Sequence, residues 1–341
     1  MRSFSCTCGN RIYFENDRCL ACGRELAFDV EQLALRPVRP GDQHCTNRVA
    51  LKTCNWLVSA PGDPFCKACA LNEIVPDLSD RRRIKLYYEV EKAKRRLLFT
   101  LLALGLPVEG RDDRKDGLAF HILADARLDG VDLDPAADEA VVTGHLEGLI
   151  TINLLEADPH LRERMRMAMN ESYRTLLGHF RHESGHYYWQ RLVKDDPSEF
   201  REVFGDERKP YREALETYYR DGPPADWQAS FINAYAASHP LEDFAECWAH
   251  YLHMADTLQT ASEDGLAIGA RRIRNPFADK PTFGSMLEDW QAVAGVVNDL
   301  NNSLGLDDAY PFSMSNGTTA KLRFVHSLAG EIPHSPAGHR N

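Results

Sequence analysis

The sequence lacks any uninterrupted apolar run of about 20 residues, the length that a membrane-spanning helix needs. Its most apolar stretch, residues 97–106, is too short, and basic residues directly precede it. The opening residues, Met-Arg-Ser-Phe-Ser-Cys, also lack the apolar segment of a secretory signal. We therefore expect a cytoplasmic protein without a membrane span.

Cysteine is almost absent after residue 69, where only Cys247 remains, whereas the other eight cysteines lie in residues 6–69. In a cytoplasmic chain, grouped cysteines bind metal more often than they form disulfides. The abrupt end to cysteine use predicts a small N-terminal module over residues 1–77. We interpret Cys247 as a small buried residue.

Positive charge is scarce in the rear of the chain. The net charge is −11, because residues 1–110 hold 17 basic and 13 acidic side chains and residues 111–341 hold 23 and 38. An acidic surface disfavours the phosphate contacts on which non-specific nucleic-acid binding depends. The basic excess of the front lies mainly between Asp80 and Arg96, in a helical pattern that predicts a connecting helix over residues 78–110. We interpret these charges as a solvated helix face rather than a binding patch.

Two segments in the middle of the chain have the composition of strands. They are residues 118–125 and residues 139–156, the second interrupted around Gly144–Gly148 as if by a hairpin turn. Within Leu149–Leu155, Ile150 and Ile152 alternate with Thr151 and Asn153, which is typical of a half-buried strand or a strand at a sheet edge.

Helical patterns follow these strands. Asp158 and Pro159 supply an N-cap acceptor and a proline at the first helical position. Apolar residues at helical spacing then predict one helix through about Val193. A further helix is predicted from Pro240 through Met254. Residues 331–341 are rich in Pro, Gly, His and Ser, and we expect them to be disordered.

The strongest chemical signal is the sequence His-Glu-Ser-Gly-His at residues 182–186. Residues four apart on a helix share a face, so His182 and His186 can bind one zinc ion. Glu183 stands where a general base would reach a metal-bound water. The alternative is a pair of ordinary surface or core histidines. His179 lacks the intervening glutamate, and we interpret it as structural or as a partner of the metal ligands.

A catalytic zinc needs a third protein ligand. Glu242 and Glu246 lie four residues apart on one face of the later helix, so one carboxylate can bind the metal while the other accepts a hydrogen bond from a ligand histidine. Asp243, His239 and His250 lie close enough in the sequence to compete for these roles. From the residues alone, the choice between the two glutamates stays open.

The eight N-terminal cysteines form two groups of four. The first has the paired-knuckle spacing of a zinc ribbon, whereas the second spaces its first pair by eight residues, so that His44 could replace a cysteine or ligands could exchange between groups. We predict two structural zinc sites, because so short a segment has little apolar material for a core. The predicted ligands are Cys6, Cys8, Cys19 and Cys22 in one site and Cys45, Cys54, Cys66 and Cys69 in the other.

A HExxH sequence followed on a later helix by ExxxE resembles the gluzincin metallopeptidases, including the anthrax lethal factor type. The resemblance implies that Glu242 is the third zinc ligand and that Glu246 supports it. It also implies that Tyr235, seven residues before Glu242, donates a hydrogen bond to the oxyanion of the reaction. The order of a cysteine ribbon and then HESGH and EDFAE resembles a bacterial family of zinc-binding metallopeptidases with zinc ribbons, over nearly the whole chain to about Leu328.

Together these patterns predict an α+β protein. A zinc-ribbon module precedes a zincin-like metallopeptidase domain over residues 111–330, built of a small sheet and active-site helices. The predicted function is a zinc-dependent endopeptidase with one catalytic and two structural zinc ions. By analogy, a peptide or protein substrate would pair with an exposed sheet edge at Leu149–Leu155. The alternative is a zinc-ribbon protein that binds a protein or nucleic-acid partner and keeps a vestigial peptidase site.

Overall fold

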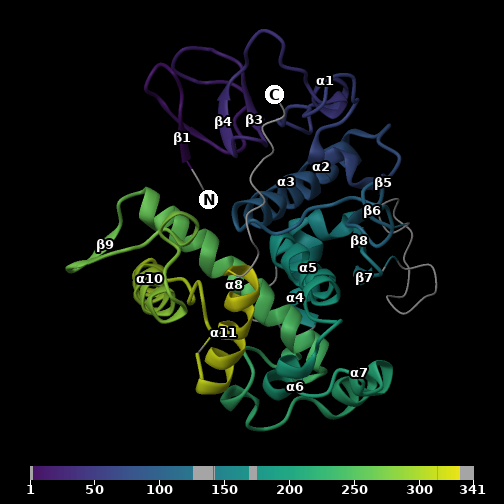
Figure 1. Cartoon of the computed structure of the whole chain (residues 1–341), viewed down its shortest axis with the longest axis vertical. Coiled ribbons are helices and arrows are strands. Elements are labelled where there is room, and N and C mark those ends of the chain that lie inside the picture. Colours follow the sequence, from purple (N-terminus) through teal and green to yellow (C-terminus); the bar gives the residue numbers. More distant parts are fainter. Residues whose placement is uncertain (1–2, 126–140, 142, 169–174, 313, 331–341) are drawn as a thin grey trace. The chain divides into compact units, whose positions relative to one another are not determined.

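The computed structural model describes residues 3–125, 141, 143–168, 175–312 and 314–330 (Figure 1). The chain forms two compact units. The first consists of residues 1–102 and 108–183, and the second of residues 103–107 and 184–341. The predicted disordered tail, residues 331–341, lies outside the described residues, as do residues 139, 140 and 142 of the predicted second strand and residues 169–174 of the predicted helix.

The first unit begins with small elements that surround the cysteines. Two antiparallel pairs of strands and two short helices make up this part, and aromatic rings fill its core. The ring of Phe28 lies 5.0 Å from Phe14 and 4.7 Å from Trp56, and Phe14 lies 5.4 Å from Phe99. These elements are β1 (Ser3–Ser5), β2 (Arg11–Tyr13), β3 (Leu26–Asp29), β4 (Ala34–Pro37), α1 (Thr46–Leu51) and α2 (Lys67–Ala70).

Helix α3 (Arg81–Ala103) occupies most of the predicted connecting segment. The interpretation of its basic residues as a solvated face is wrong for two of them, because Lys94 is 0% exposed and Arg95 is 1% exposed. Lys94 Nζ lies 2.7 Å from the Glu91 carboxylate, and Arg95 donates to the Thr53 carbonyl at 2.7 Å. A buried charge is tolerated only when it is paired and hydrogen-bonded, so these side chains belong to the core. The predicted boundaries at 77 and 110 stay a prediction.

A four-stranded sheet follows in the same unit, with strand order β5-β6-β8-β7. Its strands β5 (Asn72–Ile74), β6 (Ala119–Leu123) and β8 (Leu149–Asn153) are parallel, and β7 (Gly144–Leu146) pairs antiparallel with β8. The predicted hairpin is confirmed, but its turn is shorter than the predicted interruption: Gly144–Leu146 belong to β7, and only Glu147 and Gly148 form the turn. Both have positive φ, 47° and 84°, as two-residue hairpin turns favour.

The predicted exposed edge at Leu149–Leu155 is wrong. Strand β8 pairs with β6 on one side and with β7 on the other, so the end strands of the described sheet are β5 and β7. Ile150 and Ile152 are fully buried, whereas Leu149 and Thr151 are half-buried. The alternation of apolar and polar residues indicated which side chains are buried. It carries no information about whether a neighbouring strand is present.

The predicted single helix from Asp158 to Val193 is also wrong. The structure has α4 (Pro159–Ala168) and α5 (Leu176–Leu192), and the short 3₁₀ helix η2 (Leu154–Ala157) precedes them. Thr175 is not helical, and its hydroxyl accepts a hydrogen bond from the Gly178 amide at 2.9 Å. This is the N-cap interaction that starts a new helix. Helix α5 begins in the first unit and ends in the second.

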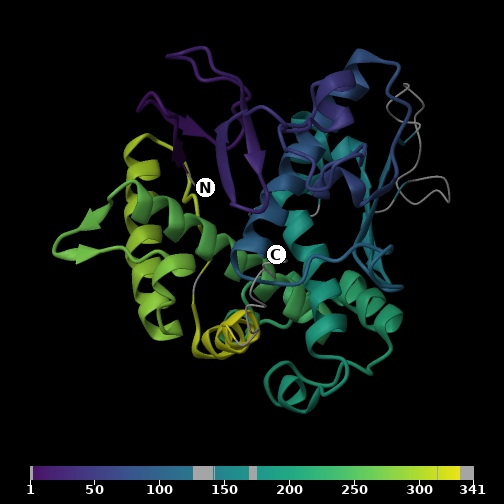
Figure 2. The same cartoon turned by 45° about the horizontal axis from the view of Figure 1, so that its top comes forward.

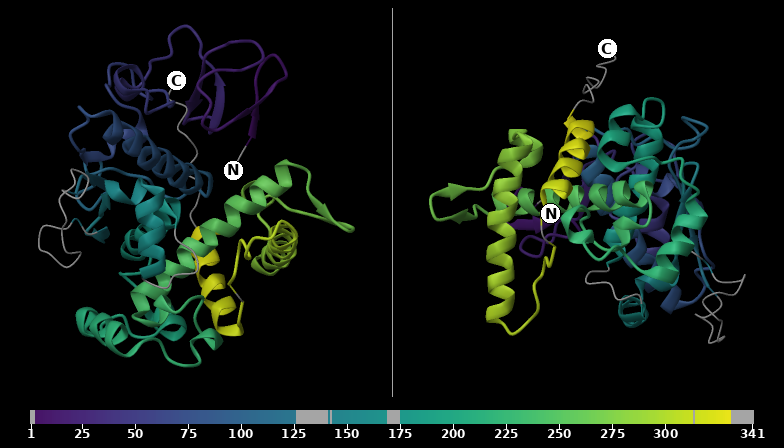
Figure 3. Two further views of the ribbon diagram at one scale, coloured as in Figure 1. Left: turned by 180° about the vertical axis from the view of Figure 1, so that it is seen from behind. Right: turned by 90° about the horizontal axis from the view of Figure 1, so that it is seen from below.

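The second unit is mostly helical, and α8 (Pro240–Glu263) is its central element, nine residues longer than predicted. Helices α10 and α11 both pack on α8 (Figure 3). Rings of Phe204, Phe244 and Phe324 join α6, α8 and α11, with centroids 5.6 and 5.7 Å from Phe204. The other elements are α6 (Ser198–Phe204), α7 (Tyr211–Asp221), η3 (Trp227–Ala229), η4 (Tyr235–Ala237), β9 (Ala267–Ile268), β10 (Arg271–Arg272), α9 (Pro276–Asp279), α10 (Phe283–Ser303) and α11 (Asn316–Gly330).

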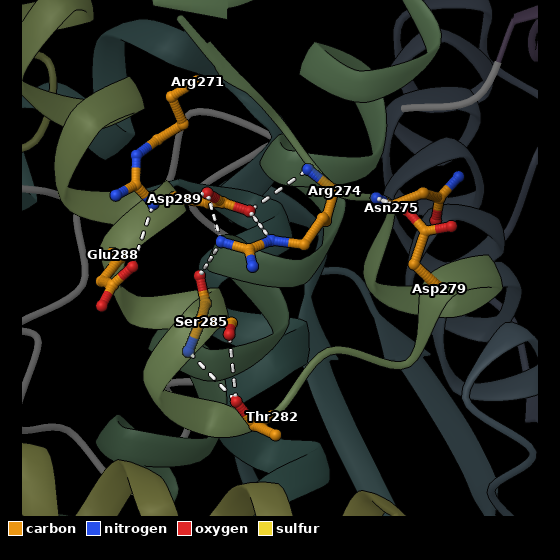
Figure 4. Close-up of polar contacts among 8 residues, drawn as sticks. All are labelled: Arg271, Arg274, Asn275, Asp279, Thr282, Ser285, Glu288 and Asp289. Atoms are coloured by element: carbon orange, nitrogen blue, oxygen red, sulfur yellow. Dashed lines mark hydrogen bonds and ion pairs between the residues drawn. The ribbon is translucent and has the colours of Figure 1, made fainter.

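The hairpin β9–β10 extends beyond the end of α8 (Figure 2), and Arg271 of this hairpin contacts two carboxylates of α10, those of Glu288 and Asp289. Asp289 is 1% exposed and accepts from Arg274 at 2.7 and 2.9 Å and from Arg271 at 3.0 Å (Figure 4). Burial acts to raise the pKa of this carboxyl, but the hydrogen bonds from the two arginines outweigh burial, so the pKa lies below its usual value.

Of the described helices, none has both the length and the apolar composition that crossing a membrane requires.

Candidate metal centres

Helices α5 and α8 bring together three of the predicted ligands. One ligand atom from each of His182, His186 and Glu242 lies within 4.8 Å of the others. The two histidines are one turn apart on α5, and Glu242 lies in the first turn of α8, where the helix dipole favours a carboxylate. The structure therefore places Glu242, and not Glu246, with the two histidines.

The spacing of these donors fits a zinc ion. Zinc binds imidazole nitrogen and carboxylate oxygen at about 2.1 Å, so neighbouring donors of a tetrahedral site are about 3.4 Å apart. His186 Nε2 lies 3.3 Å from Glu242 Oε1. Glu242 is 1% exposed, and a carboxylate so deeply buried needs a positive partner. A divalent cation supplies such a charge.

Two small residues inside the motif allow α5 and α8 to approach closely. A Cβ atom at Gly185 would lie 2.8 Å from Ala245 Cα. The neighbouring Ser184 is fully buried and accepts a hydrogen bond from the Trp248 indole at 3.1 Å. The HESGH motif predicted no role for either position. Their small size was the signal that could have indicated a close helix contact.

Glu183 lies between the two histidines on α5 and is 9% exposed. A carboxylate at this position is largely removed from bulk water, which suits a group that must exchange a proton with a nearby water molecule. Its role as general base stays a prediction.

The histidines that competed for the metal have other partners. His239 caps α8: its Nδ1 accepts from the Leu241 amide at 3.1 Å, and its Nε2 lies 3.1 Å from the Lys209 carbonyl. Burial lowers the pKa of His239, so the neutral ring can accept and donate in this way. His250 Nδ1 lies 2.7 Å from the Tyr310 hydroxyl, and His179 Nδ1 lies 2.9 Å from Glu156.

The remaining predicted residues lie on or near α8. Glu246 accepts from the Asn233 amide at 2.6 Å and lies 4.0 Å from His250 Nε2, so its predicted contact with a ligand histidine stays a prediction. Asp243 forms an ion pair with Lys321 of α11. Cys247, on the same helix, is fully buried, as predicted.

Two tyrosines flank the Glu242 carboxylate. Burial, and then the charge of Glu242, raises the pKa of the Tyr235 phenol, so this group remains a proton donor at neutral pH. Its predicted contact with an oxyanion stays a prediction. The second tyrosine, Tyr211, donates to Glu242 Oε1 at 2.7 Å. Sequence reasoning missed Tyr211, because 31 residues separate it from Glu242 and no spacing rule relates them.

The first cysteine group brings four sulfur atoms together. Cys6 lies 3.7 Å from Cys22, and Cys8 lies 3.7 Å from Cys19, measured between Sγ atoms. Zinc–sulfur bonds of about 2.3 Å place neighbouring sulfurs of a tetrahedral site about 3.8 Å apart. The Cys22 amide contributes most to lowering the pKa of the Cys19 thiol to about 6, which favours the metal-binding thiolate.

The second group has the same geometry in a different environment. Its four ligands are all cysteine, with Cys54 Sγ 3.6 Å from Cys66 Sγ, and all four are buried. His44 instead lies 3.4 Å from Glu25. Cys8 and Cys22 of the first group are exposed. The predicted grouping of the eight cysteines therefore matches the two four-sulfur clusters of the structure, and both fit zinc.

Known protein families match the same two parts of the chain, the cysteine-rich N-terminal part and the part that follows it. Residues 83–328 match the family described as "Putative zinc-binding metallo-peptidase". The chain belongs to this family. Residues 3–80 match a zinc-ribbon domain. The predicted combination of a zinc-ribbon region with a metallopeptidase domain of mixed helix and sheet is thus confirmed.

The chain is also similar to uncharacterized proteins of mycobacteria. An uncharacterized protein of Mycobacterium bovis and two of Mycobacterium tuberculosis are each 41% identical to this chain over 342 residues, covering 97% of it and 96% of their own length. No solved structure matches the chain.

Proposed function

We propose that this protein is a zinc-dependent endopeptidase. The observation that carries the proposal is the convergence of His182, His186 and Glu242, with ligand atoms within 4.8 Å of one another. A carboxylate at position 183, inside the same helical turn, completes the set of residues that peptide hydrolysis requires. Membership of the metallopeptidase family supports the same conclusion.

Each residue has a defined task in this proposal. A zinc ion held by the three ligands would lower the pKa of a coordinated water to about 7 and polarise the peptide carbonyl. Glu183 accepts a proton from the attacking water and passes it to the leaving amine. Tyr235 donates a hydrogen bond to the oxyanion that forms at the carbonyl. Glu246 supports the ligands from the next turn of α8.

The test is the variant Glu183→Gln, which keeps the size of the side chain and removes its base. We expect turnover of a peptide library to fall by about 10³-fold or more, while the variant still binds about three zinc ions per chain. Glu199→Gln, at an exposed position of α6, is the matched control and should cleave like the wild type. Cleavage by Glu183→Gln at the wild-type rate would refute the assignment.

Metal content separates this proposal from the alternative of a zinc-ribbon binding protein. A functional peptidase site gives three zinc ions per chain, and a vestigial site gives two. The burial of Lys94 and Arg95 removes two charges from the basic segment on which a nucleic-acid partner would depend. We also propose a cytoplasmic location, because reduced thiols at zinc spacing suit a reducing compartment.

A further inference from the structure

The start of helix α7 places a second phenol beside the proposed catalytic centre. Tyr211 is the first residue of this helix, and its hydroxyl lies 2.7 Å from Glu242 Oε1. The same oxygen lies 3.3 Å from His186 Nε2. The phenol therefore reaches the side of the carboxylate that faces the ligand histidine.

The position of Tyr211 is fixed by the N-terminus of α8. Its ring packs edge-on against the His239 ring, with centroids 5.1 Å apart. His239 in turn caps α8 and lies 3.1 Å from the carbonyl of Lys209, two residues before Tyr211. One histidine thus orients both the helix that carries Glu242 and the tyrosine that contacts it.

Exposure distinguishes the two tyrosines around Glu242. Tyr211 is 43% exposed, whereas Tyr235 is half-buried and packs on Tyr218, with ring centroids 5.9 Å apart. A substrate arrives from the solvent, so the exposed phenol is the more accessible of the two. If Glu242 Oε1 holds a metal ion, a substrate oxygen bound beside it would come within hydrogen-bond reach of the Tyr211 hydroxyl.

We propose that Tyr211 is a catalytic residue that donates a hydrogen bond to the oxyanion of the substrate, as a second donor beside Tyr235. The proposal rests on the proposed peptidase function. In the free enzyme, the Tyr211 hydroxyl is held by Glu242. When negative charge develops on the carbonyl oxygen, the hydroxyl turns to that oxygen, where a donor at about 2.7–3.1 Å stabilises the transition state more than the ground state.

The test compares Tyr211→Phe with Tyr219→Phe, a change of the same size at a 63% exposed position of the same helix. We expect Tyr211→Phe to lower kcat by about 100-fold, the usual effect of losing one oxyanion donor, with KM and zinc content little changed. Tyr219→Phe should behave like the wild type. Unchanged kcat in Tyr211→Phe would overturn the proposal. Loss of the catalytic zinc would also overturn it, because the phenol would then act only by holding Glu242.

A binding measurement separates this proposal from the peptidase function itself. Acetohydroxamate binds zinc through two oxygens, one of them anionic, and can accept the same hydrogen bond. We expect Tyr211→Phe to weaken its binding to the zinc-loaded protein about tenfold, the effect of one hydrogen bond to a charged group. If the wild type binds acetohydroxamate in this Tyr211-dependent way but cleaves no peptide, the peptidase function fails and the placement of the phenol stands. If peptides are cleaved and Tyr211→Phe binds acetohydroxamate like the wild type, the role of Tyr211 fails alone.

Discussion

Asp289 is a carboxylate whose charge helps to fix the hairpin β9–β10 to α10. Its pKa lies below the usual value in the folded chain, and an unfolded aspartate has a pKa of about 3.9. The folded state therefore holds the ionised form more strongly. The stability gained in this way is fully present above about pH 4 and is lost as the pH falls through the lowered folded pKa.

We expect Asp289→Asn to lower the free energy of unfolding by about 2 kcal/mol at pH 7, because two arginines lose a charged acceptor. The difference from the wild type should stay constant between about pH 5 and 8 and shrink below about pH 4. Urea unfolding at several pH values measures it. Glu288→Gln is the control, because Glu288 is 61% exposed and pairs with Arg271, which is itself 39% exposed. A difference that disappears between pH 5 and 8 would show that Asp289 titrates there, contrary to our expectation.

Individual site residues differed in how well the sequence predicted them. His182, His186 and Glu242 could be predicted because helical periodicity relates positions four apart and because the family resemblance selects one of two glutamates. Tyr211 and His239 could not be assigned in this way. Their positions depend on how the chain folds back between Lys209 and the start of α8, and no local pattern encodes such a contact.

At the scale of elements, the contact between α5 and α8 determines whether the three ligands meet. Gly185→Ala adds a Cβ atom that would lie 2.8 Å from the Ala245 Cα, so the helices must separate. We expect His186 to move away from Glu242 and the chain to retain only the two cysteine-bound zinc ions, because ligation requires distances within about 0.2 Å of ideal. Zinc analysis of the purified variant measures this. Gly284→Ala, in α10, is the control, because its added Cβ meets nothing within 4 Å. Three zinc ions in Gly185→Ala would contradict the expectation.

The strands and helices also show which features sequence periodicity cannot predict. The alternation in residues 150–153 predicted the burial of Ile150 and Ile152 correctly. It gave no information about neighbouring strands, so β8 could not be distinguished from an edge strand. In the sequence, apolar residues recur at helical spacing both in α4 and in α5, so this periodicity alone predicts one continuous helix. The helix boundary at Thr175 is marked by one N-cap hydroxyl group. A single N-cap residue is a weak signal of a helix start within a periodic segment.

At the scale of the whole molecule, the order of parts could be predicted because each part has its own local motif. The cysteine pairs and the HESGH sequence are short, and they can be recognised without knowledge of the tertiary structure. The parallel pairing of β5 with β6 could not be predicted, because it joins Asn72–Ile74 to a strand more than 40 residues later and three-residue strands carry little pattern.

The two cysteine clusters differ in how much of the fold depends on them. Cys66 is fully buried, and its neighbour Cys69 lies 3.8 Å from the buried carboxylate of Glu91 on α3. Cys8 is exposed. We call the cluster of Cys45, Cys54, Cys66 and Cys69 the inner cluster, because all four of its cysteines are buried, whereas two cysteines of the outer cluster, Cys8 and Cys22, are exposed. Removing a ligand from the inner cluster would leave unligated thiols in the core beside the paired charges of α3.

We therefore expect Cys66→Ser to lose one zinc ion and to destabilise the fold strongly, with a lower midpoint of thermal unfolding and rapid amide exchange along α3. Cys8→Ser should also lose one zinc ion but keep protection of α3, because solvent already reaches that side of its cluster. Zinc analysis and hydrogen exchange on both variants provide the comparison. If the two variants lost protection in α3 equally, the inner cluster would not be integral to the core as the burial of Lys94, Arg95 and Glu91 indicates.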